Sequence, residues 1–260
     1  MINWSELFTL TGNATLQTLA MVGASTVFSM ILGLPLGILL CITDPITGIT
    51  PKPILYQVIT RIVNVLRSFP FIILIILLFP LSRLILGTSI GTAATIVPLS
   101  IAAAPFVARI IETALKEVDP LVIQAAKSMG STNSQIIFKV LLPEAMPSLV
   151  SGVTLTIINL IGYSAMAGAV GGGGLGDLAI RYGYQRFNTP ILIASVIVIL
   201  VLVEVIQFIG TKITSTLMKN PTKTTTSWLI RIRKTWAFPM NRKKSGKKRQ
   251  SLVSYTMIPL

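Results

Sequence analysis

The sequence predicts an all-α integral membrane protein with five transmembrane helices, and two observations carry this prediction. First, 52% of the 260 residues are hydrophobic and only 12% are charged, whereas a soluble domain carries about 25% charged residues. Second, the ranges 7–43, 84–108 and 145–176 contain no Asp, Glu, Lys or Arg. Each range is long enough for a membrane span, because a helix needs about 20 apolar residues to cross the hydrocarbon core.

The spans are expected to be helices, because backbone polar groups in lipid must be satisfied within their own segment. The first span contains Gly33, Pro35 and Gly37, which membrane helices tolerate better than soluble ones. The second carries Arg67 near its start and Pro70 soon after, which predicts a kinked entry with Arg67 reaching the interface or a wet cavity. The predicted spans are 17–41, 60–81, 87–108, 149–170 and 190–211.

Lys and Arg in the loops predict that the N-terminus lies outside and the C-terminus inside, because cytoplasmic loops carry an excess of these residues. The first 16 residues lack the basic region and cleavage pattern of a secretory signal, so the first segment is expected to be an uncleaved span. In this orientation the inner side receives Lys52, Arg61, Arg67, Arg109, Lys116, Lys127, Lys139 and Lys212, and the outer side receives Arg83, Arg181 and Arg186.

The formal net charge of +14 belongs mostly to the C-terminal tail, 219–260, which holds 11 of the 22 Lys and Arg residues and none of the 8 acids. The rest of the chain carries only +3, from 11 basic residues minus 8 acids, so no nucleic-acid partner is expected. Basic and aromatic residues alternate in the tail, a composition that suits anionic membrane lipid. We expect a disordered cytoplasmic tail that transport does not need.

Cys41 is the single cysteine and the chain has no histidine. A metal site of the His/Cys type, an intrachain disulfide and a His-dependent catalytic triad are therefore excluded. No G-x-x-x-x-G-K-[ST] phosphate loop occurs either. The glycine-rich run 171–176 lacks the Lys-Ser/Thr that would follow in a nucleotide site, and we interpret it as a close-packed turn. The sequence thus predicts no catalytic residue and no cofactor bound by this chain.

The longest inner loop, 109–148, holds four of the eight acids together with recurring apolar residues. Asp119 followed by proline is typical of a helix N-cap and first helical position. Gly130 is a natural stop in the left-handed conformation, the Ser-Thr pair after it can cap a second helix, and Pro143 ends or kinks that helix. This pattern predicts two short helices hinged at Gly130, either a rigid knob that docks into a soluble partner or an amphipathic surface helix resting on lipid.

Part of this loop resembles the EAA loop of ABC importer permeases, which reads E-A-A, three residues, Gly, and a later hydrophobic-Pro pair. Gln124 stands where the motif usually has an acid, so a docking contact that depends on negative charge would be weaker here. The resemblance implies that the loop couples the membrane domain to an ATPase subunit. The residues that match the motif are Ala125, Ala126, Gly130, Leu142 and Pro143.

Further runs resemble the methionine uptake branch of these permeases, and the resemblance covers about residues 10–218. It implies a type I ABC importer permease in the bacterial cytoplasmic (inner) membrane, with two copies of the chain enclosing one pathway. Two ATPase subunits would bind ATP, and a substrate-binding lipoprotein would deliver L- or D-methionine from outside. The matching runs are 67–74, 87–94, 104–109, 162–176 and 182–184.

The fourth span holds the candidate pathway residues Tyr163, Ser164 and Met166, which lie among glycines and other small residues. Their polar or polarizable tips could line a cavity that passes a zwitterion. The alternative is plain helix packing, with the Ser164 hydroxyl bonded to its own backbone. Glu204 is the one acid inside a predicted span; we expect it to be protonated or to face a dimer seam or polar cavity, without acting as a proton relay.

Three other functions remain open at this point. A permease for another small amino acid would share the same architecture. A secondary transporter driven by an ion gradient would favour paired intramembrane charges and repeated broken helices, whereas this chain offers only Glu204 and Arg67. A passive membrane anchor or scaffold has no use for the structured loop at 109–148.

Overall fold

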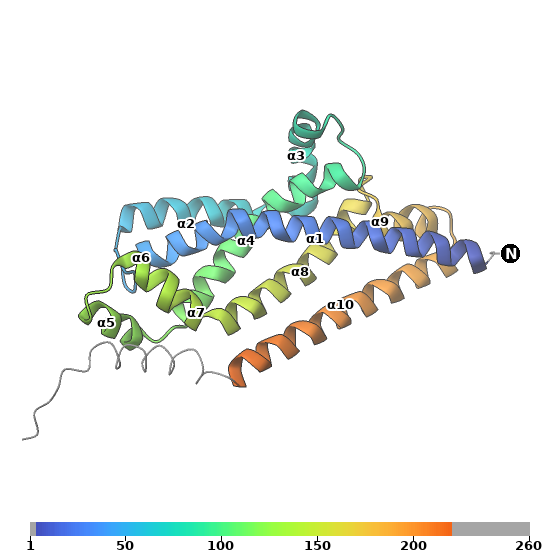
Figure 1. Cartoon of the computed structure of the whole chain (residues 1–260). Helices are drawn as coiled ribbons and strands as arrows, with labels where there is room; N and C mark the ends of the chain where they lie inside the picture. Colours follow the sequence, from blue (N-terminus) through green and yellow to red (C-terminus); the bar gives the residue numbers. More distant parts are fainter. Residues whose placement is uncertain (1–3, 220–260) are drawn as a thin grey trace, which may run out of the picture. The chain divides into compact units, whose positions relative to one another are not determined.

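The computed structural model describes residues 4–219, and every regular element in this part of the chain is a helix (Figure 1). The predicted all-α class is therefore confirmed. The tail predicted at 219–260 lies outside the described residues apart from Lys219.

Four helices are long and apolar enough to cross a membrane, and a fifth crossing results if one bent helix pair counts as a single span. This number agrees with the five predicted spans. The four long helices are α1 (Trp4–Thr43), α4 (Thr92–Lys116), α8 (Met146–Gly168) and α10 (Thr189–Lys219), and the bent pair is α2 (Pro53–Ser68) with α3 (Phe71–Leu86).

The second predicted span, 60–81, is not one kinked helix but the end of α2 and most of α3, which meet at a bend of 104°. Phe69 at the break is extended, with φ −69° and ψ 134°. Pro70 explains the break, because a proline lacks an N–H donor and disfavours the helical conformation of the residue before it. Figure 1 shows α3 turned away from the direction of α2.

Helix α1 is much longer than the predicted span 17–41. Its 40 residues extend about 60 Å, roughly twice the thickness of the hydrocarbon core. It packs along α4 at a seam of small residues. A Cβ at Gly33 would lie 2.6 Å from Cγ1 of Val107, and one at Gly37 would lie 2.7 Å from the carbonyl oxygen of Ala108. Glycine therefore lets the two backbones approach closely.

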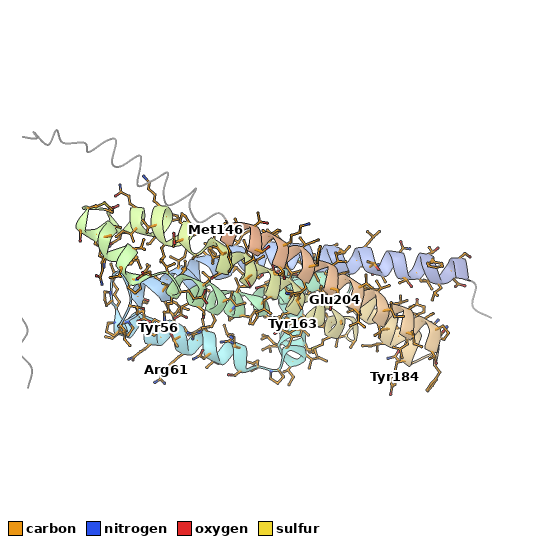
Figure 2. The ribbon with its side chains drawn as sticks, turned by 90° about the horizontal axis from the view of Figure 1, so that it is seen from below. Tyr56, Arg61, Met146, Tyr163, Tyr184 and Glu204 are labelled. Atoms are coloured by element: carbon orange, nitrogen blue, oxygen red, sulfur yellow. The ribbon has the colours of Figure 1, made fainter. Side chains whose placement is uncertain are left out.

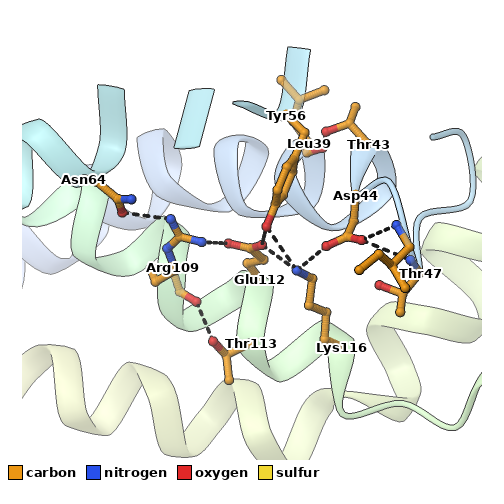
Figure 3. Close-up of polar contacts among 11 residues, drawn as sticks. Leu39, Thr43, Asp44, Thr47, Tyr56, Asn64, Arg109, Glu112, Thr113 and Lys116 are labelled. Atoms are coloured by element: carbon orange, nitrogen blue, oxygen red, sulfur yellow. Dashed lines mark hydrogen bonds and ion pairs between the residues drawn. The ribbon is translucent and has the colours of Figure 1, made fainter. Parts of the chain in front are cut away.

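At the predicted cytoplasmic ends of α1 and α4, charged side chains meet around two buried carboxylates, those of Glu112 and Asp44 (Figure 3). The Glu112 side chain is only 2% exposed and accepts from Arg109 and Lys116, each at 2.7 Å. The Lys116 ammonium also lies 2.5 Å from a carboxylate oxygen of Asp44, the residue that follows α1. Two of the three ion pairs thus lie within the last turns of α4, and the third joins α4 to the end of α1.

Helix α2 is tied to the same group. The Tyr56 hydroxyl donates to Glu112 at 3.0 Å, and the Arg109 guanidinium donates to the Asn64 side-chain oxygen at 2.9 Å. Three helices are therefore joined through polar side chains at one level of the structure. We call this group the ionic cluster; it consists of Asp44, Tyr56, Asn64, Arg109, Glu112 and Lys116.

Asp44 also shapes the turn between α1 and α2. Its carboxylate accepts from the backbone N–H groups of Ile46 at 2.7 Å and Thr47 at 3.0 Å. Burial raises the pKa of Asp44, but the hydrogen bonds from Lys116 and these two N–H groups outweigh it and lower the pKa to about 2. The carboxylate is therefore ionised at neutral pH, and its stabilising contribution is lost only as pH falls from about 4 towards 2.

The opposite end is closed by the glycine run and the two short helices after it, α9 (Gly174–Asp177) and the π-helix η2 (Leu178–Tyr184). The backbone N–H of Gly174 donates to the Gln17 side chain, and that of Leu175 donates to the Thr18 hydroxyl, both at 2.9 Å. Leu7 of α1 shares a buried apolar cluster with Leu175. The glycine run is thus the close-packed turn that the sequence predicts, and it ties this end of α1 to the loop after α8.

Replacing Lys116 by Ala is expected to lower the free energy of unfolding by about 3 kcal/mol, because Glu112 and Asp44 would stay buried without their shared cation. Thermal unfolding of the detergent-solubilised protein measures the effect. Arg61→Ala is the matched control, since Arg61 is exposed and makes no ion pair within residues 4–219, and its expected change is below about 0.5 kcal/mol. Equal shifts for the two variants would contradict a stabilising ionic cluster.

Candidate coupling surface and translocation face

The inner loop begins with α5 (Pro120–Ser128), which forms because Asp119 caps it. The Asp119 carboxylate accepts from the backbone N–H of Leu121 at 2.9 Å, and a proline occupies the first helical position, where no N–H is needed. The predicted start is therefore confirmed. Helix α4 extends to Lys116, so the loop itself is shorter than the predicted range 109–148.

Gly130 forms the hinge, with φ +78°. The N–H of Ser131 donates to the carbonyl of Ala126 at 3.2 Å, and the N–H of Gly130 donates to that of Lys127 at 2.9 Å. This is the Schellman pattern, in which the left-handed residue allows the chain to leave the helix. A Cβ at Gly130 would meet nothing within 4 Å. Glycine is therefore favoured at this position by the left-handed backbone conformation, and not by a lack of space for a side chain.

The second arm of the loop starts at Thr132, whose hydroxyl accepts from the N–H of Gln135 while the Gln135 side chain accepts from the N–H of Thr132. This capping box fixes the direction of the arm after the hinge. Pro143 has no N–H to bond the carbonyl four residues earlier, and a π-helical stretch precedes it instead of one regular helix. The arm consists of α6 (Asn133–Ile136), the π-helix η1 (Ile137–Leu141) and α7 (Leu142–Glu144).

Both arms pack against the turn between α1 and α2. Ala126 of the first arm and Ile136 of the second are buried in one apolar cluster, against which Ile49 and Ile123 pack. Leu142 packs against a second cluster formed by the inner ends of α1 and α4. The loop is therefore held to the same helix ends that the ionic cluster joins.

The predicted coupling residues divide into an outward and an inward set. Gln124, Ala125 and Gly130 are exposed, whereas Ala126 is buried. Leu142 and Pro143 are partly buried behind them. Large apolar side chains lie on the outward side as well, and their exposed fractions are 67% for Leu121, 50% for Met129 and 66% for Phe138. We call Leu121, Gln124, Ala125, Met129 and Phe138 the loop surface.

The three predicted pathway residues do not share one face of α8. Tyr163 is half-buried and stacks on Phe71 at the start of α3, with ring centroids 4.1 Å apart. Ser164 is 2% exposed and donates to the carbonyl of Ile161 at 2.8 Å, the backbone bond considered as the alternative. Met166 is 48% exposed. Figure 2 shows Tyr163 in the middle of the helices.

Arg67, which the sequence predicts to reach the interface or a wet cavity, lines a cavity of about 270 Å³ between α2, α4 and α8. Arg109, Glu117 and Ser148 line the same space, and the Ser148 hydroxyl donates to the Glu117 carboxylate. Arg109 belongs to the ionic cluster. The cavity therefore combines a mainly apolar lining, which includes Phe106, Ile110 and Leu155, with side chains of both signs of charge, and it lies beside the helix ends that hold the loop.

Glu204 is exposed on α10 (Figure 2) and makes no hydrogen bond or ion pair with residues 4–219. Its neighbours along the helix are apolar and exposed as well, among them Leu200 and Phe208. A bare carboxylate on an apolar face has a high free energy in lipid. Within one chain, the structure thus offers Glu204 neither a partner nor burial.

The ionic cluster is the feature that the sequence interpretation missed. Its signal is visible in α4, where Arg109, Glu112 and Lys116 recur at spacings of three and four residues and so share one helix face. The contributions of Asp44 and Tyr56 carry no comparable signal, because they come from other segments of the chain.

This chain is similar to known proteins both in sequence and in structure. A family model for the binding-protein-dependent transport system inner membrane component matches residues 33–216. The probable D-methionine transport system permease protein MetI of Vibrio cholerae is 50% identical over 197 residues, which are 76% of this chain and 87% of that protein. The methionine import system permease protein MetP of Bacillus subtilis is 51% identical over 164 residues, 63% of this chain and 74% of that protein.

A solved structure of the MetNI methionine ABC transporter in an inward-facing conformation superimposes with a TM-score of 0.79. The aligned sequences are 45% identical, and the match covers 82% of this chain and 98% of that one. The helical architecture described above is thus similar to that of a solved ABC transporter chain.

Proposed function

The chain belongs to the family of binding-protein-dependent transport system inner membrane components, and from this premise we propose that it is the permease subunit of an ATP-driven importer of L- or D-methionine. The observation that supports methionine as the substrate is the 50% sequence identity to a probable D-methionine permease, over 87% of that protein's length. The protein is accordingly a multi-pass protein of the bacterial inner membrane. It transports and does not catalyse a reaction of its own.

ATP is bound by a separate ATPase subunit in this proposal, since the chain has no phosphate-binding loop. The loop surface is the dock. The exposed apolar side chains of Leu121, Met129 and Phe138 can be buried in a groove of the ATPase subunit. Exposed Gln124 adds an uncharged hydrogen-bonding group. Both arms of the loop are packed onto α1 and α4, so a push on α5 moves these helices with it.

A second copy of the chain and membrane lipid cover the remaining apolar surface. Only 11% of the most apolar window of α10 is buried within one chain, and α3 exposes Leu77, Leu84 and Ile85. A single chain therefore leaves open the faces that would enclose a pathway. Two copies related by symmetry bury such faces with one self-complementary interface.

Met166 is the pathway residue most able to contact the substrate, because its thioether is exposed and polarizable. Tyr163 supports it by fixing α8 to α3 through the stack on Phe71. Ser164 contributes by its small size, which allows close packing at a position that is buried. A substrate-binding lipoprotein delivers methionine to the outer end of this path.

Gly130→Arg is expected to reduce ATP-dependent uptake at least tenfold, because a side chain strains the left-handed hinge and enlarges the docking loop. The measurement is uptake of labelled methionine into vesicles that contain the permease with its ATPase, supplied with the binding protein. Gly87→Arg is the matched control. Gly87 has φ +77°, is exposed and has open space around its Cβ position, but it ends α3 away from the loop.

Normal uptake by Gly130→Arg, or an equal loss in Gly87→Arg, would contradict coupling through the loop. Uptake driven by an ion gradient without the ATPase would overturn the importer class. ATP-dependent uptake of a different amino acid would keep the mechanism and replace the substrate.

Glu204→Gln is expected to leave uptake within about twofold of wild type, because removing the charge from an apolar face breaks no hydrogen bond or ion pair within residues 4–219. The same vesicle assay measures it, with the amount of inserted protein as the control. A loss above about tenfold at normal expression would assign a transport role to this carboxyl group.

Truncation after Lys219 is expected to preserve methionine uptake, because the family match ends at residue 216. Uptake and co-purification of the ATPase subunits are compared with those of the full chain. A truncated protein that no longer assembles with the ATPase would show that the basic tail takes part in the complex.

A further inference from the structure

One aromatic side chain occupies a backbone conformation that favours glycine. Apart from glycines, Phe187 alone has a positive φ among residues 4–219, and its value is +54°. The surrounding hydrogen bonds explain the geometry. Asn188 N–H donates to the carbonyl of Gly183 at 2.8 Å, and Phe187 N–H donates to that of Tyr184 at 3.2 Å. These bonds form a Schellman motif at the end of η2, with Phe187 at the position where glycine or asparagine is usual.

Packing does not compensate for this strain. The Phe187 side chain is 89% exposed, and that of Tyr184 before it is 70% exposed. A left-handed phenylalanine is less stable than a left-handed glycine because its Cβ crowds the backbone, and here the ring gains no burial in return. Strained residues that a fold retains without a packing benefit cluster at binding and switching sites.

The surroundings of Phe187 are cationic. The Arg186 guanidinium lies 4.6 Å from the ring centroid of Tyr182, and that of Arg181 lies 5.4 Å from it. Arg181 is paired with Asp177 at 3.5 Å, whereas Arg186 makes no ion pair within residues 4–219. Arg186, the neighbour of Phe187 in the chain, thus adds a positive charge beside the exposed aromatic side chains, and Glu6 lines the same small pocket as Arg186 without forming an ion pair with it.

This segment lies at the end that the charge rule assigns to the outside. It follows the glycine turn that is tied to the first half of α1, and α10 starts two residues after Phe187. Helix α10 has 31 residues, about 46 Å, against a hydrocarbon core of about 30 Å. Its first turn therefore has length to reach beyond the core, into the region that a soluble protein can touch.

We propose that Phe187 and Tyr184, bordered by Arg186, form a docking knob for the substrate-binding protein. This inference rests on the proposed function and adds the surface that meets the partner. The family depends on a binding protein by definition, and the hydrogen-bonded turn holds the ring outward before the partner arrives, which lowers the entropic cost of docking. The partner surface that fits is an apolar pocket with an acidic border.

The experiment uses the complete permease–ATPase complex in lipid nanodiscs and titrates the cognate binding protein loaded with methionine. The readout is the concentration of binding protein that half-saturates ATPase stimulation. Phe187→Gly is expected to raise this concentration about tenfold, as loss of a central aromatic contact does, while ATPase activity without binding protein stays unchanged. Thermal stability should equal or exceed that of wild type, because glycine relieves the strain.

Phe187→Tyr is the matched control, since it keeps the ring and the strained backbone, and it is expected to stay within about twofold of wild type. Arg186→Gln should weaken the rise of the half-saturating concentration with salt, because it removes a positive charge that forms no ion pair within residues 4–219. An unchanged salt dependence would overturn the role of this arginine.

Wild-type behaviour of Phe187→Gly in a complex that the binding protein stimulates would overturn the docking knob and leave the proposed function intact. A fall in basal activity or thermal stability in Phe187→Gly would also overturn it, in favour of membrane anchoring by the ring. A wild-type complex that does not respond to methionine-loaded binding protein would overturn the proposed function together with this inference.

Discussion

The Glu112 side chain is an acidic group buried from solvent, and the helix ends in the inner half of the structure are arranged around it. A buried carboxylate without partners has a prohibitive free energy, so Arg109, Lys116 and Tyr56 must all stay close to it. These partners come from α4 and α2, and Lys116 in turn holds Asp44 after α1. Three helices therefore meet at these side chains: separating α2 would break the hydrogen bonds of Tyr56 and Asn64, and separating the end of α1 would break the ion pair between Lys116 and Asp44.

This constraint has a mechanical consequence for the inner loop. Helix α4 ends in the ionic cluster and the chain continues within three residues to α5. Both arms of the loop also pack on the turn that Asp44 shapes. Displacement of the loop surface is therefore transmitted to α1 and α4 as a rigid unit. At the other end, hydrogen bonds from the glycine turn to Gln17 and Thr18 hold α1 to the segment that continues to Phe187, so one helix contacts both the inner loop and the outer segment.

Strength of packing differs sharply between the faces of the molecule. The contact of α1 with α4 uses glycines and buried side chains, whereas α10 and α3 leave large apolar residues uncovered. A membrane domain that encloses a pathway only as a pair needs such a division, since the open faces must remain free to meet a partner copy or lipid. The exposed Glu204 lies on this uncovered side.

The sequence alone determined the helical class and the number of membrane crossings, because both follow from the lengths of the apolar segments. It also determined the caps and the hinge of the inner loop, because Asp119, Thr132 and Gly130 act on neighbouring residues alone. Pro70 signalled a kink, but the size of the bend between α2 and α3 depends on what α3 packs against. Tertiary structure alone decided which motif residues are exposed, that Ser164 is buried, that Asp44 pairs with Lys116, and that Tyr56 bonds to Glu112. Those outcomes depend on contacts between segments far apart in the chain. The i,i+3 and i,i+4 pairs around Glu112 can be read from the sequence, but no local pattern records that Asp44 and Tyr56 will join them.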